Sequence, residues 1–446
     1  MASVLTESQS KELQKAIIGY LSTINADKTA ATMRDELGFN VGFTHTYGKL
    51  AHILEKKWTT NTLLQRKVMT LEAQVDRLGK ALESFPQSQS RNQEPFKWLP
   101  VQPAYTLKSH RAAITSVAFH PAFSSLASSS EDCTIKIWNW ELGELEKTFK
   151  GHTATITGLD FGGNINHILL ASCSNDLLIK LWDPSKDYAN IRTLSGHGHT
   201  VSCVRFLTPN QNTLVSASRD TSIRFWDVLT GSCVKTIFTD CGWIRDLAPS
   251  YDGRWLISGS SDHNATIWNV ASGNSQSILR GHGSPLECCA FAPPTSHSYL
   301  IALVGAKEPQ VRSSAGFVAT GGRDKTIKLW DLQGGLIKTL VGHDNWVRGL
   351  VFHPGGRFLL SVGDDRSIKC WNLAEGARLW KTLDNIHDGF ISCIRWAPCA
   401  VSPIERHHSP KETLETRPVS EEEMRTSGFP CVLATGSTDS KVHVFA

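Results

Sequence analysis

Asp324-Lys-Thr-Ile-Lys-Leu-Trp330 places a tryptophan six residues after an aspartate. The same spacing returns throughout the part of the chain that follows residue 100. The other pairs are Asp132 and Trp138, Asp176 and Trp182, Asp220 and Trp226, Asp262 and Trp268, Asp365 and Trp371, and, with phenylalanine replacing tryptophan, Asp439 and Phe445. A pattern with a period in the low forties indicates a chain built from copies of one structural unit.

The other parts of each copy also return in a fixed order. Each copy begins with a Gly-His pair or its substitute, as at Gly342-His343, and continues with alternating apolar residues, as in the segment 201–206. This alternation is typical of a β-strand, and three further strands lead to the next copy. Seven copies of four antiparallel strands, arranged radially, predict a mainly β fold, a seven-bladed β-propeller over residues 104–446. The repeat resembles the WD40 family.

The two ends of the repeat region predict how the ring closes. The chain stops after the third strand of the last copy, at 441–445, whereas Ala104 to Leu107 resembles a fourth strand without its own blade. Pairing these two segments would remove an open sheet edge. We therefore expect the first and last strands to share one blade.

Two copies depart from the pattern, and two are long. The fourth copy has Asp240 where histidine is expected, and the seventh has Phe445, which lacks an indole donor. Residues 293–316 and 398–430 are inserted between first and second strands, and both are rich in Ser, Pro and charge. We expect both inserts to be mobile surface loops. His407-His408 in the second insert lacks nearby Cys or spaced acids, so we interpret it as solvated.

The first 47 residues have a different pattern. Thr6 to Gln9 can form a capping box, and the helix expected after it carries Leu13, Ile17 and Leu21 on one side. A short second helix is expected from Lys28 to Leu37. Two such helices bury little surface alone and gain most from packing against a second copy. The pattern resembles a LisH motif, which implies dimerisation.

Residues 48–85 predict a third helix that ends in a short parallel coiled coil. Position a holds β-branched residues, position d holds leucine, and an asparagine precedes them, a combination that favours two strands. The core residues are Asn61, Leu64, Val68, Leu71, Val75, Leu78 and Leu82. The alternative is an amphipathic helix packed on its own domain. Residues 86–103 are rich in Pro, Gln, Ser and Asn and predict a flexible linker.

The composition excludes several classes of protein. The net charge of +4 is too small to indicate nucleic-acid binding by itself. No apolar stretch approaches the length of a membrane span, and the start does not resemble a signal peptide, so we expect a soluble intracellular chain. The eleven cysteines include Cys203, Cys288 and Cys393, which recur where Ser116 stands in another copy. We expect these to be small, buried, reduced side chains.

Ser, His and Asp occur together in most copies, so a hydrolase triad is an alternative to a binding function. An active site is usually built once, however, whereas this set recurs at structural positions. The chain also lacks a G-x-S-x-G elbow, a P-loop and an H-E-x-x-H motif. We therefore expect no catalytic residues, no metal site and no cofactor.

The positions that the repeat leaves free differ between copies. These positions flank the repeated aspartate or lie three and five residues after the Gly-His histidine. Copies three to six concentrate Arg and Trp there, whereas the first two copies offer Ala113, Thr115, Thr155 and Thr157. The residues expected to bind a partner are Arg219, Trp243, Arg245, Arg323, Trp346, Arg348 and Arg366. Arg and Trp dominate protein-binding hot spots, so we expect an acidic or polar protein partner. A solvated basic rim with two packed rings is the alternative.

The order of LisH-like front, coiled coil and propeller, together with the segments 55–58, 216–220 and 341–349, closely resembles the lissencephaly protein family. Its fungal members are called nuclear distribution proteins. The resemblance implies a non-catalytic, homodimeric regulator that binds the motor domain of the cytoplasmic dynein heavy chain through one propeller face. Its partner-binding positions match Arg219, Arg245, Arg323, Trp346 and Arg366.

The resemblance also implies roles in nuclear migration, spindle positioning and microtubule-based transport. It implies a NudE-type coiled-coil adaptor, an indirect link to microtubules, and a place in the cytoplasm at microtubule ends and spindle poles. Two other functions stay open: a scaffold or substrate receptor in a ubiquitin ligase or corepressor complex, and a regulatory subunit of an acetylhydrolase.

Overall fold

The computed structural model describes Thr29 and residues 99–164, 167–207, 212–240, 242–304, 316–397 and 432–446. Thr29 is helical, as expected for the segment from Lys28 to Leu37. The other predicted helices, the predicted coiled coil and the insert at 398–430 lie outside the described residues. The chain divides into two units, Met1–Pro95 and Phe96–Ala446. In the described residues, no helix has the length and apolar character needed to cross a membrane.

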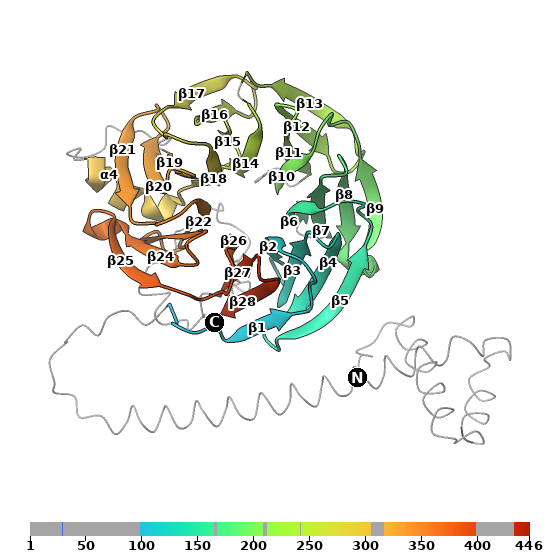
Figure 1. The fold of residues 1–446 in the computed structure, drawn as a ribbon. Coiled ribbons are helices and arrows are strands. Elements are labelled where there is room, and N and C mark those ends of the chain that lie inside the picture. Colours follow the sequence, from blue (N-terminus) through green and yellow to red (C-terminus); the bar gives the residue numbers. More distant parts are fainter. Residues whose placement is uncertain are drawn as a thin grey trace, which may run out of the picture. The chain divides into compact units, whose positions relative to one another are not determined.

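The second unit is a ring of seven four-stranded antiparallel sheets (Figure 1). The first strand of each sheet lies nearest the axis, and the fourth lies at the outside. In blades 1 to 3, the strands are β2 Ile114–Phe119, β3 Ser125–Ser130, β4 Thr134–Asn139 and β5 Glu144–Lys150; β6 Ile156–Asn164, β7 His167–Ser174, β8 Ile179–Asp183 and β9 Ala189–Leu194; and β10 Val201–Phe206, β11 Thr213–Ser218, β12 Ser222–Asp227 and β13 Cys233–Phe238.

Blades 4 to 6 follow the same plan. Their strands are β14 Ile244–Pro249, β15 Trp255–Ser260, β16 Ala265–Asn269 and β17 Ser275–Leu279; β18 Leu286–Phe291, β19 Phe317–Gly322, β20 Thr326–Asp331 and β21 Leu336–Val341; and β22 Val347–Phe352, β23 Phe358–Gly363, β24 Ile368–Asn372 and β25 Arg378–Leu383. Short 3-10 helices follow β8 at Pro184–Lys186 (η1) and β24 at Leu373–Glu375 (η3).

Blade 7 closes the ring as the sequence predicts. It contains β26 Ile391–Trp396, β27 Leu433–Ser437, β28 Lys441–Phe445 and, from the other end of the unit, β1 Tyr105–Lys108. Strands β1 and β28 pair antiparallel, with Tyr105 opposite Val444 and Leu107 opposite Val442. Leu107 and Val444 also pack with Ile114 of blade 1 in one buried cluster. The prediction of a shared blade is therefore confirmed.

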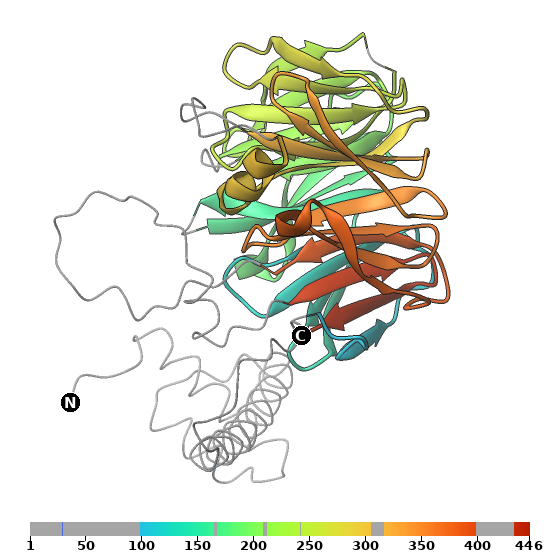
Figure 2. The same ribbon diagram turned by 90° about the vertical axis from the view of Figure 1, so that its left-hand side faces the viewer.

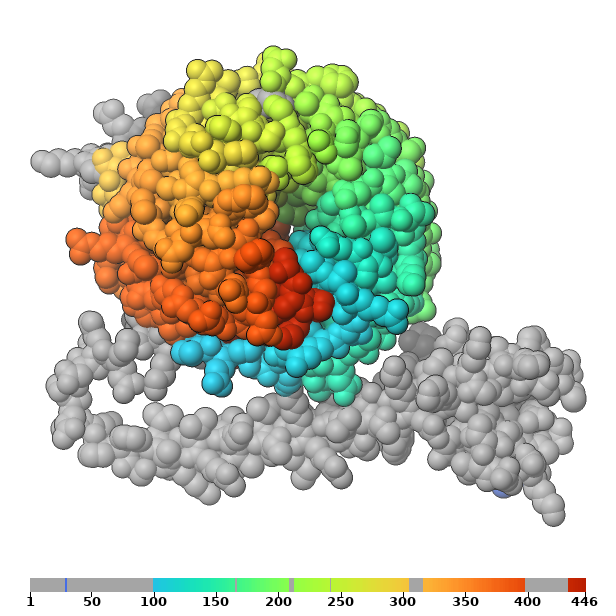
Figure 3. Space-filling view, viewed as in Figure 1, coloured from blue at the N-terminus to red at the C-terminus, as the bar shows by residue number. Residues whose placement is uncertain are grey.

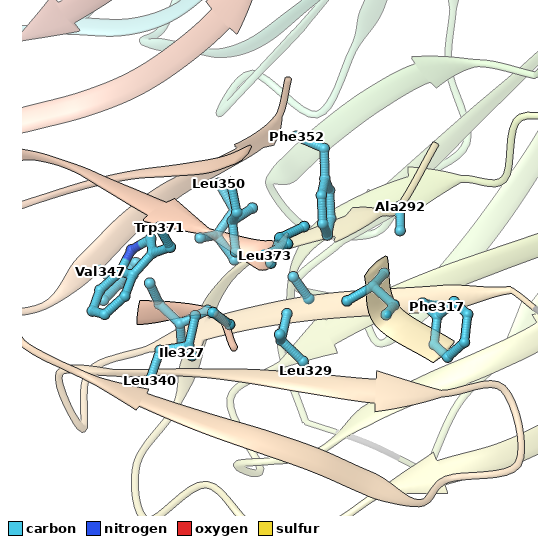
Figure 4. Close-up of a cluster of buried hydrophobic side chains, with 14 of the residues drawn as sticks. Ala292, Phe317, Ile327, Leu329, Leu340, Val347, Leu350, Phe352, Trp371 and Leu373 are labelled. Carbon is cyan, nitrogen blue, oxygen red and sulfur yellow. The ribbon is translucent and has the colours of Figure 1, made fainter. Parts of the chain in front are cut away.

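The apolar cores lie between neighbouring blades, because each sheet buries both faces. The largest cluster joins blades 5 and 6, where Ile327 and Leu340 lie beside Val347 and Trp371 (Figure 4). Burial of such side chains contributes about 1.5–3 kcal/mol for each fully buried one. Seven interfaces of this kind make a rigid ring that presents its loops at fixed positions.

Two boundary predictions are wrong. The predicted linker 86–103 ends too late, because Leu99 is buried in the core beside Phe358 and its carbonyl oxygen accepts a hydrogen bond from Lys381 Nζ at 2.7 Å. The predicted mobile loop at 293–316 begins with ordered helices, η2 (Pro294–Ser296) and α4 (His297–Val304), which lie on one face of the disc (Figure 2).

Leu300 of α4 gives the physical reason for the second correction. Its side chain is fully buried among the residues that join blades 5 and 6. Thr295 Oγ1 also donates to the carbonyl oxygen of Pro354 at 2.8 Å, and the backbone of Gly356 passes so close to Thr295 that a Cβ would collide with it. A composition rich in Ser and Pro concealed this short apolar segment.

Candidate functional site

A buried chain of hydrogen bonds holds each complete blade, and blade 2 shows its geometry. Trp182 Nε1 donates to Ser172 Oγ at 2.8 Å, Ser172 Oγ lies 2.8 Å from His152 Nε2, and His152 Nδ1 lies 2.8 Å from Asp176 Oδ2. Burial lowers the pKa of His152, although its bond to Asp176 opposes this, so the imidazole is neutral. Its Nδ1–H therefore donates to the aspartate, and its Nε2 accepts from the serine.

The same chain recurs in four other blades. Its members are His110, Ser128, Asp132 and Trp138; His197, Ser216, Asp220 and Trp226; His282, Thr320, Asp324 and Trp330; and His343, Ser361, Asp365 and Trp371. The serines and the threonine of these chains are fully buried. They are held inside the blades and cannot reach a dissolved substrate as nucleophiles.

The two divergent copies change the network as predicted. Asp240 is exposed, and Ser258 in blade 4 accepts from Trp268 Nε1 at 2.8 Å and donates to the carbonyl oxygen of Thr266 at 3.4 Å, where the complete blades have a histidine. In blade 7 the ring of Phe445 is buried without a donor, and Thr435 retains the bond to His387 at 2.9 Å.

The repeated aspartate also shapes the loops that carry the free positions. Asp220 Oδ1 accepts from the backbone N–H of Ser222 at 2.9 Å, and Oδ2 accepts from that of Gly198 at 2.8 Å. Burial alone would raise the pKa of Asp220, but hydrogen bonds from Ser222 and His197 lower it to about 2. The residue after each repeated aspartate has a left-handed backbone with φ between 60° and 73°, at Cys133, Leu177, Thr221, His263, Lys325, Arg366 and Ser440.

These loops define one face, here called the rim, where first strands begin and second strands turn into third strands. On the rim of blades 3 and 4, the guanidinium carbons of Arg219 and Arg245 lie 5.1 and 4.0 Å from the ring centroid of Trp243. Trp243 Nε1 donates to Ser202 Oγ at 2.7 Å, which fixes the ring. Cation–π contacts of this kind contribute about 0.5–2 kcal/mol. We call these three residues the first stack.

A second stack repeats this arrangement on blades 5 and 6. The guanidinium carbons of Arg323 and Arg348 lie 4.1 and 4.9 Å from the ring centroid of Trp346. Arg348 also donates to both carboxylate oxygens of Asp364, at 2.9 and 3.0 Å. Six of the seven predicted partner-binding residues therefore form two matching stacks.

Glu287 connects the two stacks, and the sequence analysis missed it. Its Oε1 lies 3.0 Å from Arg245 of the first stack and 2.6 Å from Arg323 of the second, and its Oε2 lies 3.2 Å from Arg348. Glu287 stands five residues after His282, at the free position that Arg245 and Arg348 occupy in the neighbouring blades. An acid between two arginines at one repeat position was the signal that could have revealed it.

Arg366, the seventh predicted residue, is exposed, and its Nη1 donates to the carbonyl oxygen of Asp388 at 3.4 Å. The rim of blades 1 and 2 differs, because it carries threonines whose hydroxyl groups are hydrogen-bonded within the propeller. Thr115 Oγ1 bonds to Ser129 Oγ at 2.8 Å, and Thr157 Oγ1 donates to the carbonyl oxygens of Cys173 in its own blade and Val201 in blade 3. The Arg and Trp side chains thus make one side of the rim distinct.

The ring is hollowed at its axis (Figure 3). This cavity of about 460 Å³ is lined by Glu287 and one arginine of each stack, Arg245 and Arg348, and also by Cys203, Cys288 and Arg205. Cys203 and Cys288 are buried, as predicted, and burial raises the pKa of both thiols. Cys393 is only partly buried. The described residues contain no group of three or more His, Cys, Asp or Glu that could hold a metal ion.

Two family comparisons agree with this architecture. Six segments match the family described as WD domain, G-beta repeat: residues 101–139, 143–183, 189–227, 231–269, 273–331 and 334–372. Residues 7–41 match the family described as PAC1 LisH domain. The LisH-like front expected from apolar spacing is therefore confirmed as a LisH domain.

Full-length relatives are similar to this protein over its whole length. It is 54% identical over 448 residues to nuclear distribution protein nudF of Aspergillus niger, 56% identical over 451 residues to nuclear distribution protein PAC1-1 of Uncinocarpus reesii, and 54% identical over 451 residues to nudF of Emericella nidulans. Each alignment covers 100% of both proteins.

Proposed function

Because this chain belongs to the family of nuclear distribution proteins named nudF and PAC1, we propose that it is a non-catalytic, dimeric regulator of cytoplasmic dynein. It binds the motor domain of the dynein heavy chain through the rim and acts in nuclear migration, spindle positioning and microtubule-based transport. The names of the relatives support the role in nuclear distribution, and the resemblance to the lissencephaly family supports dynein as the partner.

The two Arg–Trp stacks are the observation that carries the binding surface. They combine positive charge and flat aromatic surface, and their side chains are held in place before a partner binds. Arg and Trp in such a setting are typical of a protein-binding hot spot. Arg219 is exposed, and among the described residues it forms no ion pair with a carboxylate, so its charge is available to a partner. An acidic protein surface fits these stacks better than nucleic acid, which would require a larger and more widely spread basic excess.

Dimerisation through the first 85 residues gives the regulator two rims on one tether. After one propeller binds, the second binds at an effective concentration set by the segment between the two units, which raises the overall affinity. Two propellers that prefer one conformation of the motor shift its population toward that conformation and change its hold on the microtubule.

The proposed cellular location and partners follow from the same membership of the nuclear distribution protein family. The regulator works in the cytoplasm at microtubule ends and the spindle pole, together with a NudE-type coiled-coil adaptor, and reaches microtubules through dynein. Purification of the chain from its source cell tests this setting. Recovery of ligase, corepressor or acetylhydrolase subunits without dynein heavy chain would favour the other two functions.

Binding of the isolated dynein motor domain tests the rim directly. Arg219→Ala with Arg323→Ala removes one arginine from each stack, and we expect a loss of about 2 kcal/mol or more, roughly thirtyfold in Kd. Arg254→Ala is the matched control, since this exposed arginine lies between β14 and β15, on the face opposite the rim. Unchanged affinity of the rim variant, with an unchanged unfolding midpoint, would exclude the rim as the binding surface.

A truncated chain tests the tether. Without residues 1–85 the protein should sediment as a monomer, and its release of dynein from microtubules should need a higher concentration. A truncated chain that remains dimeric would show that the first 85 residues are not the dimerisation region.

A further inference from the structure

Glu287 is the only described acid that contacts arginines of both stacks. Its side chain is 8% exposed, at the start of β18. The side chains of its three partners, Arg245, Arg323 and Arg348, are 14%, 27% and 29% exposed. One nearly buried carboxylate therefore holds three partly exposed guanidinium groups.

These three positive charges repel one another. Burial lowers the pKa of Arg245, and the like charges of Arg323 and Arg348 lower it further, whereas Glu287 opposes both effects. Asp364 neutralises Arg348 from the other side, but Arg245 and Arg323 have no other carboxylate partner among the described residues. Without Glu287, mutual repulsion would drive the guanidinium groups apart and away from the two tryptophan rings.

We propose that Glu287 is a positioning residue that holds the two stacks as one pre-oriented surface for acidic groups of the partner. This inference rests on the proposed function, in which the rim binds the dynein motor domain. Fixing Arg323 and Arg245 before binding removes the entropic cost of ordering long side chains, which is the usual advantage of pre-orientation. Loss of Glu287 therefore weakens binding, although it makes the rim more positive.

Simple charge complementarity makes the opposite prediction, which makes the sign of the effect decisive. If Glu287 only competed with the partner's carboxylates for the arginines, its removal would tighten binding. Glu287→Gln preserves the size of the side chain and removes its charge. Glu131→Gln is the matched control, because Glu131 is an exposed acid lining the same axial cavity, in the turn between β3 and β4 of blade 1.

The experiment measures Kd of the full-length chain for the dynein motor domain at fixed salt. We expect Glu287→Gln to weaken binding about tenfold, the effect of freeing two or three arginine side chains. Glu131→Gln should change Kd by less than about twofold, because rim charges away from the contact contribute little. Equal or tighter binding by Glu287→Gln would overturn the positioning role.

A second substitution separates positioning from a general structural role. If Glu287 acts through the arginines, Glu287→Gln should have a smaller effect in an Arg323→Ala background than in the native chain. An equal effect in both backgrounds would contradict the inference. Glu287→Asp keeps the charge but shortens its reach, so we expect an intermediate loss of affinity. The inference would also be contradicted if Glu287→Asp lost as much affinity as Glu287→Gln while Arg323→Ala left Kd unchanged.

The two hypotheses fail in different ways. If the native chain does not bind the motor domain, the proposed function is wrong. If the native chain binds and Arg219→Ala with Arg323→Ala weakens binding, but Glu287→Gln does not, only the positioning role is wrong. An unfolding midpoint measured for each variant identifies a loss of affinity that comes from a loss of fold.

Discussion

In blade 6, polar side chains serve two purposes within a short distance along the chain. Inside the blade, Ser361 lies between His343 Nε2 and Trp371 Nε1, at 2.7 and 2.9 Å, and is fully buried. At the rim, Trp346 and Arg348 remain partly exposed. The buried set returns in blade after blade, whereas the rim set changes from blade to blade.

This difference follows from what each region must satisfy. A buried polar group without a partner costs about 1–3 kcal/mol, so a blade that contains any of the four network residues must also contain the groups that pair with it. An exposed position has no such requirement, and its residue is free to suit a partner. Variants of the network should therefore change stability without changing affinity, and variants of the rim should do the reverse.

The largest expected effect is on stability, from Ser361→Ala. This change leaves the Trp371 N–H and the His343 ring nitrogen buried without a partner, and we expect a loss of about 3 kcal/mol in the free energy of unfolding. In blade 4 no histidine bonds to Ser258, so Ser258→Ala removes the acceptor of the Trp268 N–H without unpairing an imidazole, and we expect a loss of about 1–2 kcal/mol. Urea denaturation of the full-length chain measures both.

Equal losses from the two serine substitutions would show that the histidine adds nothing to the network. A loss of affinity for the motor domain by folded Ser361→Ala protein would contradict the separation between blade interior and rim. The blade 4 variant is the matched control, since both serines accept from a buried tryptophan.

The sequence predicts the buried region better than the rim for the same reason. The network recurs in five of the seven copies, so the bonds of His, Ser, Asp and Trp and the missing histidine at Asp240 could be predicted from the sequence. The pairing of β1 with β28 could be predicted as well, because the last copy lacks a fourth strand. Six rim residues could also be predicted to come together, because the repeat aligns their positions. Their partner Glu287 does not stand out in the same way, because a concentration of Arg and Trp gives no indication of an acidic residue between them.

Local packing explains the boundary errors. Leu99 and Leu300 lie in short apolar stretches within longer segments that are rich in Pro, Ser and other polar residues, and the overall composition of such segments is typical of loops. Each fills a gap in a core formed by distant strands, beside Phe358 and Phe317 respectively. Neither contact has a counterpart in the other copies, so the repeat could not predict it.

A smaller effect on stability is expected from pH in blade 7. His443 stacks on His387 with ring centroids 3.9 Å apart, and burial, followed by the charge of His387, lowers its pKa to about 4. The folded state thus excludes a proton that the unfolded chain binds below its usual pKa of 6.5. The contribution of neutral His443 to the free energy of unfolding is fully present above pH 6.5 and is lost as the pH falls toward 4.

His443→Thr tests this assignment, because Thr266 occupies the same position in blade 4. Between pH 7 and pH 5, we expect the native chain to lose on the order of 1–2 kcal/mol more than the variant. Urea denaturation at both pH values measures the difference. Parallel losses in the two proteins would show that His443 does not take up the proton.

The smallest effect is expected from Arg366→Ala, at the edge of the rim. Arg366 is exposed and outside both stacks, and its Nη1 donates to the carbonyl oxygen of Asp388 at 3.4 Å. An exposed charge contributes about 0.2–1 kcal/mol, so we expect Kd for the motor domain to rise by about threefold, mainly through slower association at low salt. Stability should not change. A loss as large as that of the Arg219 and Arg323 variant would extend the hot spot beyond the two stacks and show that contact with a tryptophan ring is not what distinguishes its members.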